Sequence, residues 1–224
     1  MIREKQDIQI ETTADGSNTL FIPQLDEHYH SVKGALTESE HIFIRMGLEH
    51  LPLSSVRLLE IGFGTGLNAF LTLLAAERLN KSVHYTGIEL YPLEESTLKQ
   101  LGYPEIICPQ QAENYYRLHA CKWEQDNPIT DNFTLHKIKG DFTTYLFSGN
   151  YDLIYFDAFA PEKQAGRWTQ ELFNSLYVIM NKGGILTTYC AKGVVRRMLQ
   201  SAGFTVERLP GPPQGKREIL RATK

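Results

Sequence analysis

Three glycines alternate with other residues between an apolar segment and a helix-like pattern, at Gly62, Gly64 and Gly66. Because glycine has no Cβ, such a loop lets the backbone turn tightly and lets a ligand approach the main chain. A strand, a glycine loop and a helix in this order form the first unit of nucleotide-binding α/β folds. The spacing differs from the G-x-G-x-x-G pattern of dinucleotide sites. Together with the acidic Glu60 just before the loop, it favours S-adenosylmethionine over NAD as the ligand.

Carboxylates also follow two further predicted strands. Glu89 ends the strand predicted at 83–89 and lies 27 residues after Gly62, where an acidic residue accepts hydrogen bonds from ribose hydroxyls. Asp157 directly follows the predicted strand 151–156, which is apolar enough to be central and covered on both faces. Ligands of open α/β sheets bind outside such strand ends. We therefore expect Asp157 to face the reactive end of the ligand.

The elements that must position these residues form one predicted sheet. After the strand ending at Ile61, strands are expected at 83–89, 134–139, 151–156, 185–190, 204–208 and 217–222. The short connection 210–216 between the last two implies an antiparallel pair. Seven strands with an antiparallel last strand are the Rossmann-like α/β architecture of class I S-adenosylmethionine-dependent methyltransferases, which is the predicted fold.

An N-terminal extension precedes this sheet. Residues 8–22 alternate around a turn at 14–17 and predict a β-hairpin. Thr37 and Glu40 have the spacing of a capping box, which predicts a helix that begins after Thr37 and ends near Leu51. We accordingly divide the chain into residues 1–53, a hairpin and helix extension packed on the core, and residues 54–224, the S-adenosylmethionine-binding methyltransferase domain.

Composition narrows the class of protein. With 224 residues, 42% of them apolar and 22% charged, the sequence is that of an ordinary globular protein. It has no transmembrane-length apolar segment and no apolar run behind its charged N-terminus, so no membrane association is expected. Three scattered cysteines without a C-x-x-C pair favour a reducing, cytoplasmic location over disulfides or a zinc site. No metal is expected, because no further cluster of ligand residues follows His28 and His30.

Charge is unevenly distributed along the chain. Residues 192–224 carry eight basic and two acidic residues, a net charge of +6, which leaves −9 for the rest of a chain with a net charge of −3. Such asymmetry is typical of a patch that faces a polyanion, and it is equally typical of a solvated lysine and arginine surface. Both interpretations remain open on charge alone.

Several segments, taken together, resemble the methyltransferase domain of tRNA 5-methylaminomethyl-2-thiouridine biosynthesis. The resemblance extends from about Tyr29 to the C-terminus and rests on residues 29–31, 34–39, 60–68, 156–163, 168–173 and 215–218. It differs in the segment 163–168, which lacks the proline usual before the tryptophan and is expected to form a looser loop.

The resemblance implies an activity. Members of this family use S-adenosylmethionine to methylate the primary amine of 5-aminomethyl-uridine at the tRNA wobble position. In many bacteria the domain is fused to an FAD-dependent oxidase that produces this amine. Nothing in this chain resembles that oxidase, so a stand-alone form without flavin is expected, with tRNA as its partner and a functional link to the enzymes that generate the aminomethyl group.

Site residues follow from the motifs and the resemblance together. Asp157 is the predicted catalytic residue, because a carboxylate beside the methyl group can orient the amine and accept its proton. The predicted cofactor-binding residues are Glu60, Gly62, Phe63, Gly64, Gly66, Asn68, Glu89, Leu90, Asp141 and Phe142. The predicted substrate-binding residues are Tyr29, Glu38, Lys163, Trp168, Arg196, Arg197, Lys216 and Arg217. Tyr29 and Glu38 are implied by the resemblance alone, and the basic residues are expected to contact phosphates. Trp168 has the alternative role of a core residue.

Two rival functions remain. A polyamine-type aminopropyltransferase shares the fold, the aspartate after the fourth strand and an amine acceptor, but uses a decarboxylated cofactor. A non-catalytic RNA-binding module on the same fold is the other. The intact glycine loop with Glu89 and Asp157 favours the methyltransferase.

Overall fold

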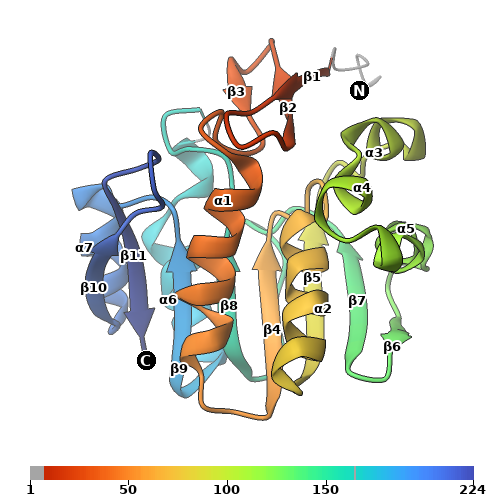
Figure 1. The fold of residues 1–224 in the computed structure, drawn as a ribbon. Coiled ribbons are helices and arrows are strands. Elements are labelled where there is room, and N and C mark those ends of the chain that lie inside the picture. The colour runs from red at the N-terminus through yellow and green to blue at the C-terminus, as the bar shows by residue number, and fades with distance from the viewer. Residues whose placement is uncertain (1–7, 164) are drawn as a thin grey trace.

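The computed structural model describes residues 8–163 and 165–224, and its centre is an eight-stranded sheet (Figure 1). The strand order is β10-β11-β9-β8-β4-β5-β7-β6. The four inner pairs β9/β8, β8/β4, β4/β5 and β5/β7 are parallel, whereas β11 is antiparallel to both of its neighbours. The predicted α/β fold with an antiparallel last strand is thereby confirmed. The strands are β4 (Ser55–Ile61), β5 (Ser82–Glu89), β6 (Asp126–Thr130), β7 (Phe133–Lys139), β8 (Tyr151–Phe156), β9 (Met180–Thr188), β10 (Thr205–Pro210) and β11 (Glu218–Thr223).

The expected count of seven strands is wrong by one for the described part of the chain. The additional strand is β6, which lies at the edge of the sheet and pairs antiparallel with β7. Its sequence, DNPIT, contains residues that are depleted in strands. Pro128 has no backbone N–H to donate to a neighbouring strand, and it is tolerated because β6 has a neighbour on one side only.

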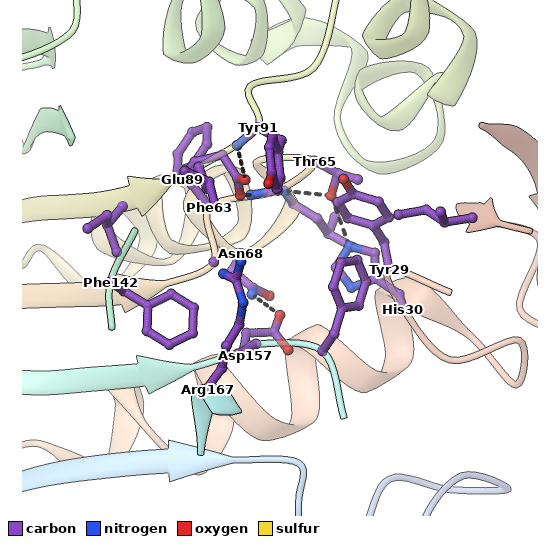
Figure 2. Close-up of a pocket in the computed structure, with 18 of the residues that line it drawn as sticks. Tyr29, His30, Phe63, Thr65, Asn68, Glu89, Tyr91, Phe142, Asp157 and Arg167 are labelled. Carbon is purple, nitrogen blue, oxygen red and sulfur yellow. Dashed lines mark hydrogen bonds between the residues drawn. The ribbon is translucent and has the colours of Figure 1, made fainter. Parts of the chain in front are cut away.

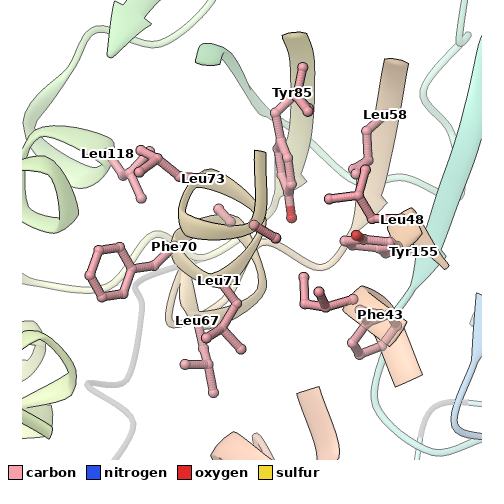
Figure 3. Close-up of a cluster of buried hydrophobic side chains, with 14 of the residues drawn as sticks. Phe43, Leu48, Leu58, Leu67, Phe70, Leu71, Leu73, Tyr85, Leu118 and Tyr155 are labelled. Atoms are coloured by element: carbon pink, nitrogen blue, oxygen red, sulfur yellow. The ribbon is translucent and has the colours of Figure 1, made fainter. Parts of the chain in front are cut away.

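Helices cover both faces of the sheet and create two apolar clusters. On one face α2 (Leu67–Leu79) packs on β4 and β5, flanked by the helix from the N-terminal extension and by α5 (Ala112–Ala120). Phe43, Phe70 and Tyr155 belong to this cluster (Figure 3). On the other face α6 (Gln170–Ile179) and α7 (Gly193–Ala202) pack together and cover β8 and β9. The remaining short helices are α3 (Glu95–Leu101), α4 (Tyr103–Ile107), Pro109–Gln111 and Ala165–Arg167.

The N-terminal extension forms a small sheet above the carboxyl ends of the central strands (Figure 1). The predicted hairpin is present as β1 (Gln9–Thr12) and β2 (Asn18–Ile22), and β3 (Glu27–His28) adds a third strand. The following helix starts at Ala35 rather than after Thr37, as α1 (Ala35–Ser39), and continues through a π-helical segment, Glu40–Arg45, to a 3-10 turn, Leu48–His50.

The predicted capping box is therefore wrong, and its absence has a physical cause. The Thr37 side chain caps nothing, because this residue already lies inside α1. Its backbone N–H instead donates to the Asp15 carboxylate at 2.8 Å. An acidic side chain from the turn of the hairpin thus satisfies a free amide of the first helical turn.

Two remaining expectations concern membranes and cysteines. Across residues 8–163 and 165–224, none of the helices combines the length and the hydropathy needed to cross a bilayer. The three cysteines are free thiols: Cys190 is buried and Cys108 and Cys121 are half-buried.

Candidate active site

The glycine loop joins β4 to α2 and lies against the main chain that follows β8. Gly62 has a φ of 91°, and a Cβ at this position would lie 2.7 Å from the carbonyl oxygen of Asp157. Gly64 and Gly66 have φ values of 50° and 70°. Left-handed φ values and this close approach explain why the loop requires glycine. The loop and the segment that begins at Asp157 therefore fix one another's positions.

Three side chains from distant segments hold the loop at Thr65. The Tyr115 hydroxyl and the His119 Nε2–H both donate to the Thr65 carbonyl oxygen, at 3.0 and 3.1 Å. His30 Nε2 forms a hydrogen bond of 2.9 Å with the Thr65 hydroxyl. Burial lowers the pKa of His119 to about 3 and that of His30 to about 4, so both rings are neutral near pH 7.

A cavity opens at the carboxyl ends of β4, β5 and β8, and we name it the glycine-loop cavity (Figure 2). Glu89 and Tyr91 lie on one side of it and Asp157 on the other. The N-terminal extension closes its outer side through Tyr29 and His30. Its lining residues are Ile22, Leu25, Tyr29, His30, Gly62, Phe63, Gly64, Thr65, Leu67, Asn68, Ile88, Glu89, Leu90, Tyr91, Phe142, Asp157, Ala158, Phe159 and Arg167.

Glu89 is held at the end of β5 by two backbone amides. Its Oε2 accepts from the Gly64 N–H at 2.9 Å, and its Oε1 accepts from the Tyr91 N–H at 2.7 Å. A carboxylate offers about four acceptor positions, so Glu89 has capacity left for two hydroxyl groups. The same bonds hold the glycine loop against the end of β5.

Asn68, in the first turn of α2, connects two carboxyl groups. Its Nδ2 donates to Glu60 Oε1 at 2.9 Å and to Asp157 Oδ2 at 2.8 Å. Burial raises the pKa of Asp157 to about 7, with a contribution from the negative charge of Glu38, whereas Asn68 and Lys216 lower it. Burial also raises the pKa of the fully buried Glu60 well above its ordinary value. Asp157 thus lies near the midpoint of its titration at neutral pH.

A second hollow, which we name the Glu38 cavity, adjoins the first. Tyr29, His30 and Asp157 line both, together with Ala158 and Phe159. The remaining lining residues are Glu27, His28, Ser31, Val32, Glu38, Tyr189 and Lys216. Asp157 consequently stands between a cavity suited to a nucleoside and a cavity that carries carboxylates.

Most predicted cofactor-binding residues line the glycine-loop cavity, but three do not. Glu60 lies beneath it, 0% exposed. Gly66, at the end of the loop, faces away from the cavity toward the ring of His119. Asp141 accepts hydrogen bonds from the backbone and hydroxyl of Thr143 and lies 3.8 Å from Arg167. The predicted contacts of these three residues with the cofactor therefore stay predictions.

The predicted substrate-binding residues divide in the same way. Tyr29, Glu38 and Lys216 line the Glu38 cavity. Lys163 is ion-paired with Asp26 at 3.0 Å. Arg196, Arg197 and Arg217 line neither of these two cavities. In the segment 163–168, which is expected to form a looser loop, Gln164 lies outside the described residues.

Trp168 occupies the core rather than a substrate surface. Its side chain is 4% exposed, and its indole N–H donates to the Phe159 carbonyl oxygen at 2.8 Å. Its ring packs against Phe156 and Phe173. The alternative role considered for this residue fits its position: it supports the segment after Asp157.

Metal ligands do not gather in the described residues, where no group of three or more His, Cys, Asp or Glu side chains could hold an ion. His28 pairs with Glu11 at 3.0 Å, and His30 bonds to Thr65. Sequence reasoning did not assign His30, Phe159, Arg167 or Tyr189 to the site. His30 and Phe159 lie within the segments 29–31 and 156–163 that carry the resemblance, but no motif gave these two residues, Arg167 or Tyr189 a role in the site.

Comparison with known proteins places the chain among methyltransferases. Residues 110–224 match the model of a family described as S-adenosyl-L-methionine-dependent methyltransferase. The tRNA 5-methylaminomethyl-2-thiouridine biosynthesis bifunctional protein MnmC of Magnetococcus marinus is 31% identical over 215 residues, which are 91% of this chain and 32% of that protein. The corresponding protein of Pseudomonas entomophila is 30% identical over 203 residues, 84% of this chain and 31% of that protein. The chain thus spans about a third of the length of these curated relatives.

Solved structures show the same fold. The crystal structure of MNMC2 from Aquifex aeolicus superposes with a TM-score of 0.77 at 24% identity, covering 98% of this chain and 71% of that one. Spermidine synthase from Thermotoga maritima superposes with a TM-score of 0.59 at 16% identity, covering 100% of this chain and 71% of that one. At these identities the likeness concerns the fold alone.

Proposed function

We propose that this chain, which belongs to the family of S-adenosyl-L-methionine-dependent methyltransferases, methylates the primary amine of 5-aminomethyl-uridine at the wobble position of tRNA. The observation that carries the proposal is the place of Asp157, which lines both the glycine-loop cavity and the Glu38 cavity. One carboxyl group can therefore face a methyl donor on one side and an amine on the other.

The glycine-loop cavity has the chemistry that S-adenosylmethionine requires. Glu89 presents carboxylate oxygens with free acceptor positions to the two ribose hydroxyls. Ile88, Leu90 and Phe142 provide an apolar slot for the flat adenine ring. The backbone of Gly62 and Gly64 borders the same space without a Cβ on the loop, which suits a methionine chain that lies close to the main chain.

When bound, S-adenosylmethionine would supply a methyl group on a sulfonium: the amine nitrogen would bond to the methyl carbon as the carbon–sulfur bond breaks, and the neutral thioether would leave. The task of the protein is to position the amine and to manage its proton. An alkylammonium has no lone pair, so one proton must leave before the nitrogen can attack. Asp157, with a pKa of about 7, accepts that proton and becomes a neutral carboxyl. Asp157 then releases this proton to solvent, and its carboxylate stabilises the positive charge that methylation restores on nitrogen.

The acceptor is proposed from the relatives and from the site together. The Magnetococcus marinus protein is named for tRNA 5-methylaminomethyl-2-thiouridine biosynthesis, a product that carries one methyl on an aminomethyl nitrogen. The acidic Glu38 cavity is suited to the ammonium form of such a group. We place the reaction in the cytoplasm because the proposed substrate is tRNA, and we propose that a separate catalytic unit makes the aminomethyl group.

A methyl-transfer assay tests the proposal. The protein is incubated with methyl-labelled S-adenosylmethionine and with tRNA that carries 5-aminomethyl-uridine, and the nucleosides are separated after digestion. Label is expected in 5-methylaminomethyl-uridine and is expected to fall at least about a hundredfold in Asp157→Asn, the loss of a proton acceptor. A tRNA with unmodified uridine serves as the control acceptor.

Two outcomes would contradict the proposal. Absence of transfer to the aminomethyl tRNA would remove the function, and transfer by Asp157→Asn at the wild-type rate would remove Asp157 from the mechanism. Decarboxylated S-adenosylmethionine is the control donor: transfer of its aminopropyl group would instead identify an aminopropyltransferase. Calorimetry that detects no S-adenosylmethionine binding would favour a non-catalytic RNA-binding module.

A further inference from the structure

The Glu38 cavity already contains a positive charge supplied by the chain itself. Lys216 Nζ lies 3.0 Å from Glu38 Oε1 and 4.6 Å from the centre of the Tyr189 ring. A carboxylate and an aromatic face on one ammonium form a good cation site. Lys216 is one of the residues predicted to contact tRNA phosphates, and in the structure its ammonium borders the Glu38 cavity beside Glu38 and Tyr189.

Both partners of this ion pair are positioned by the fold. Glu38 belongs to α1, its side chain is 10% exposed, and its Oε2 accepts from the Ser31 N–H at 2.9 Å. Lys216 comes from the loop between β10 and β11, and its side chain is 40% exposed. The Tyr189 hydroxyl donates to the Ala158 carbonyl oxygen at 2.8 Å, which fixes the ring on which the ammonium rests. The pair thus joins the N-terminal extension to the C-terminal hairpin on the wall of a cavity that Asp157 also lines.

The charges facing Asp157 are few and come from several elements. From α2 it receives the Asn68 hydrogen bond, and from α1 it meets the charge of Glu38. Lys216 brings the opposing positive charge. The other titratable groups on the walls of the two cavities are Tyr29, His30, Glu89, Tyr91, Arg167, Tyr189, Glu27 and His28, with Glu60 beneath Asn68. In the Glu38 cavity, the buried carboxyl of Glu38 and the half-buried carboxyl of Asp157 therefore both experience the charge of one lysine.

We propose that Glu38 and Lys216 form a charge-setting pair for Asp157: Lys216 neutralises Glu38, so that Asp157 alone is left to meet the ammonium group of the acceptor. This inference rests on the proposed function and deepens it, because it assigns the selection of a singly charged amine to named residues. With Lys216 in place, two carboxylates face one resident and one incoming ammonium, and the charges balance. Without Lys216 the two carboxylates repel each other and one of them retains a proton.

The pair acts on Asp157 with opposite signs. The negative charge of Glu38 raises the pKa of Asp157, and the positive charge of Lys216 lowers it. Lys216→Met should therefore raise that pKa and Glu38→Gln should lower it, each by about 1 pH unit for a charge at this range. Both roles are positioning roles, since neither residue needs to touch the reacting atoms.

Four variants and two measurements test the inference. Lys216→Met removes the charge, Lys216→Arg keeps it, Glu38→Gln removes the carboxylate while keeping an oxygen for the Ser31 N–H, and Lys182→Met is the matched control on an exposed lysine of β9. The first measurement is a carboxyl-carbon NMR titration of the protein without substrate, in which Asp157→Asn assigns the resonance. The second is kcat/KM for methyl transfer to the aminomethyl tRNA between pH 6 and pH 9.

The expected changes depend on pH in a way that misfolding would not reproduce. In Lys216→Met the Asp157 titration moves upward and kcat/KM falls about tenfold at pH 6 but less than about twofold at pH 9. In Glu38→Gln the titration moves downward and kcat/KM at pH 6 rises about fivefold. Lys216→Arg and Lys182→Met are expected to retain the wild-type profile.

The two readouts separate failure of this inference from failure of the proposed function. If the wild-type protein transfers no methyl group, the function fails, and the NMR titration still decides whether the pair sets the Asp157 charge. An Asp157 titration that is unchanged in both Lys216→Met and Glu38→Gln overturns the inference. So does a loss of kcat/KM in Lys216→Met that is equal at every pH.

Discussion

Asn68 and Asp157, 89 residues apart in the chain, are joined by a hydrogen bond of 2.8 Å between Nδ2 and Oδ2. The first belongs to the helix that follows the glycine loop and the second to the end of β8. This bond directly connects the helix after the glycine loop to the carboxyl that we propose to meet the acceptor. Several consequences can be measured.

Replacing Asn68 by alanine should weaken both stability and catalysis. Glu60 and Asp157 would each lose the donor they share, and the free energy of unfolding should fall by about 1–3 kcal/mol. The pKa of Asp157 should also rise, because the bond stabilises its charged form, so the acid limb of the kcat/KM profile moves to higher pH. Urea unfolding and a pH profile check both effects. Asn174→Ala, on the exposed side of α6, is the control, and its free energy of unfolding should remain within about 0.5 kcal/mol of the wild-type value. An equal loss of stability in this control would contradict the bridging role of Asn68.

Replacing Asp157 by asparagine should make the protein inactive yet more stable in alkaline solution. The folded pKa of about 7 exceeds the ordinary value of 3.8, so ionisation of this carboxyl lowers the free energy of unfolding. This loss of stability is absent below about pH 4, grows as the pH rises, and levels off above about pH 7. Allowing for solvent in the cavities, the variant should gain about 1–3 kcal/mol at pH 8 and little at pH 4. Denaturant titrations of both proteins at several pH values measure the difference in the free energy of unfolding. A gain in stability that is the same at every pH would refute this explanation.

Gly62→Ala should impair cofactor binding beyond the usual effect of an alanine with positive φ. Gly16 provides the matched control, with a φ of 84° against 91° and nothing within 4 Å of an added Cβ. Both variants should lose about 1–2 kcal/mol of stability from backbone strain. In Gly62→Ala the Cβ additionally meets the Asp157 carbonyl at 2.7 Å, so S-adenosylmethionine affinity and methyl transfer should both fall more than about tenfold. Calorimetry showing equal affinities for the two variants would exclude this contact as the cause.

Removing the Tyr115 hydroxyl should loosen the glycine loop without touching the cofactor. Tyr115→Phe deletes one of the two donors to the Thr65 carbonyl oxygen, a loss of about 1 kcal/mol. If the loop is held ready for the ligand, S-adenosylmethionine should bind about fivefold more weakly. Tyr116→Phe, one residue away at a half-buried position that lines neither cavity, should bind normally. Titration calorimetry compares them, and equal Kd values would show that the His119 bond alone suffices.

The glycine loop and the strand-end carboxylates were predictable because their signals are local. Positions 60–68 and the apolar strand before Asp157 depend on backbone requirements that a short stretch of sequence displays. Two glycines and a carboxylate at the ends of parallel strands necessarily meet at one edge of the sheet, and Gly62, Gly64 and Glu89 do. The helix start at Ala35 was missed because its cap, Asp15, lies in another element.

The parts that could not be predicted depend on contacts between distant segments. Nothing near Lys216 in the sequence indicates that its ammonium turns inward to Glu38, because their pairing requires the N-terminal extension and the last hairpin to meet. The hydrogen bonds by which His30 and His119 hold the glycine loop could not be predicted either, because they also join distant segments. Strand β6 was hidden by its composition, and only its place at the sheet edge makes that composition acceptable.

The hydrogen bond from the Trp168 indole to the Phe159 carbonyl gives the protein a built-in optical reporter. The chain has two tryptophans, and the other, Trp123, lies beneath the Lys137 ammonium, 4.7 Å from ring centre to Nζ and outside both cavities. In Trp123→Phe the remaining emission would come from the one indole tied to the segment that carries Asp157. The arrival of an acceptor at that segment could then be followed as a change in fluorescence, in real time and without a label.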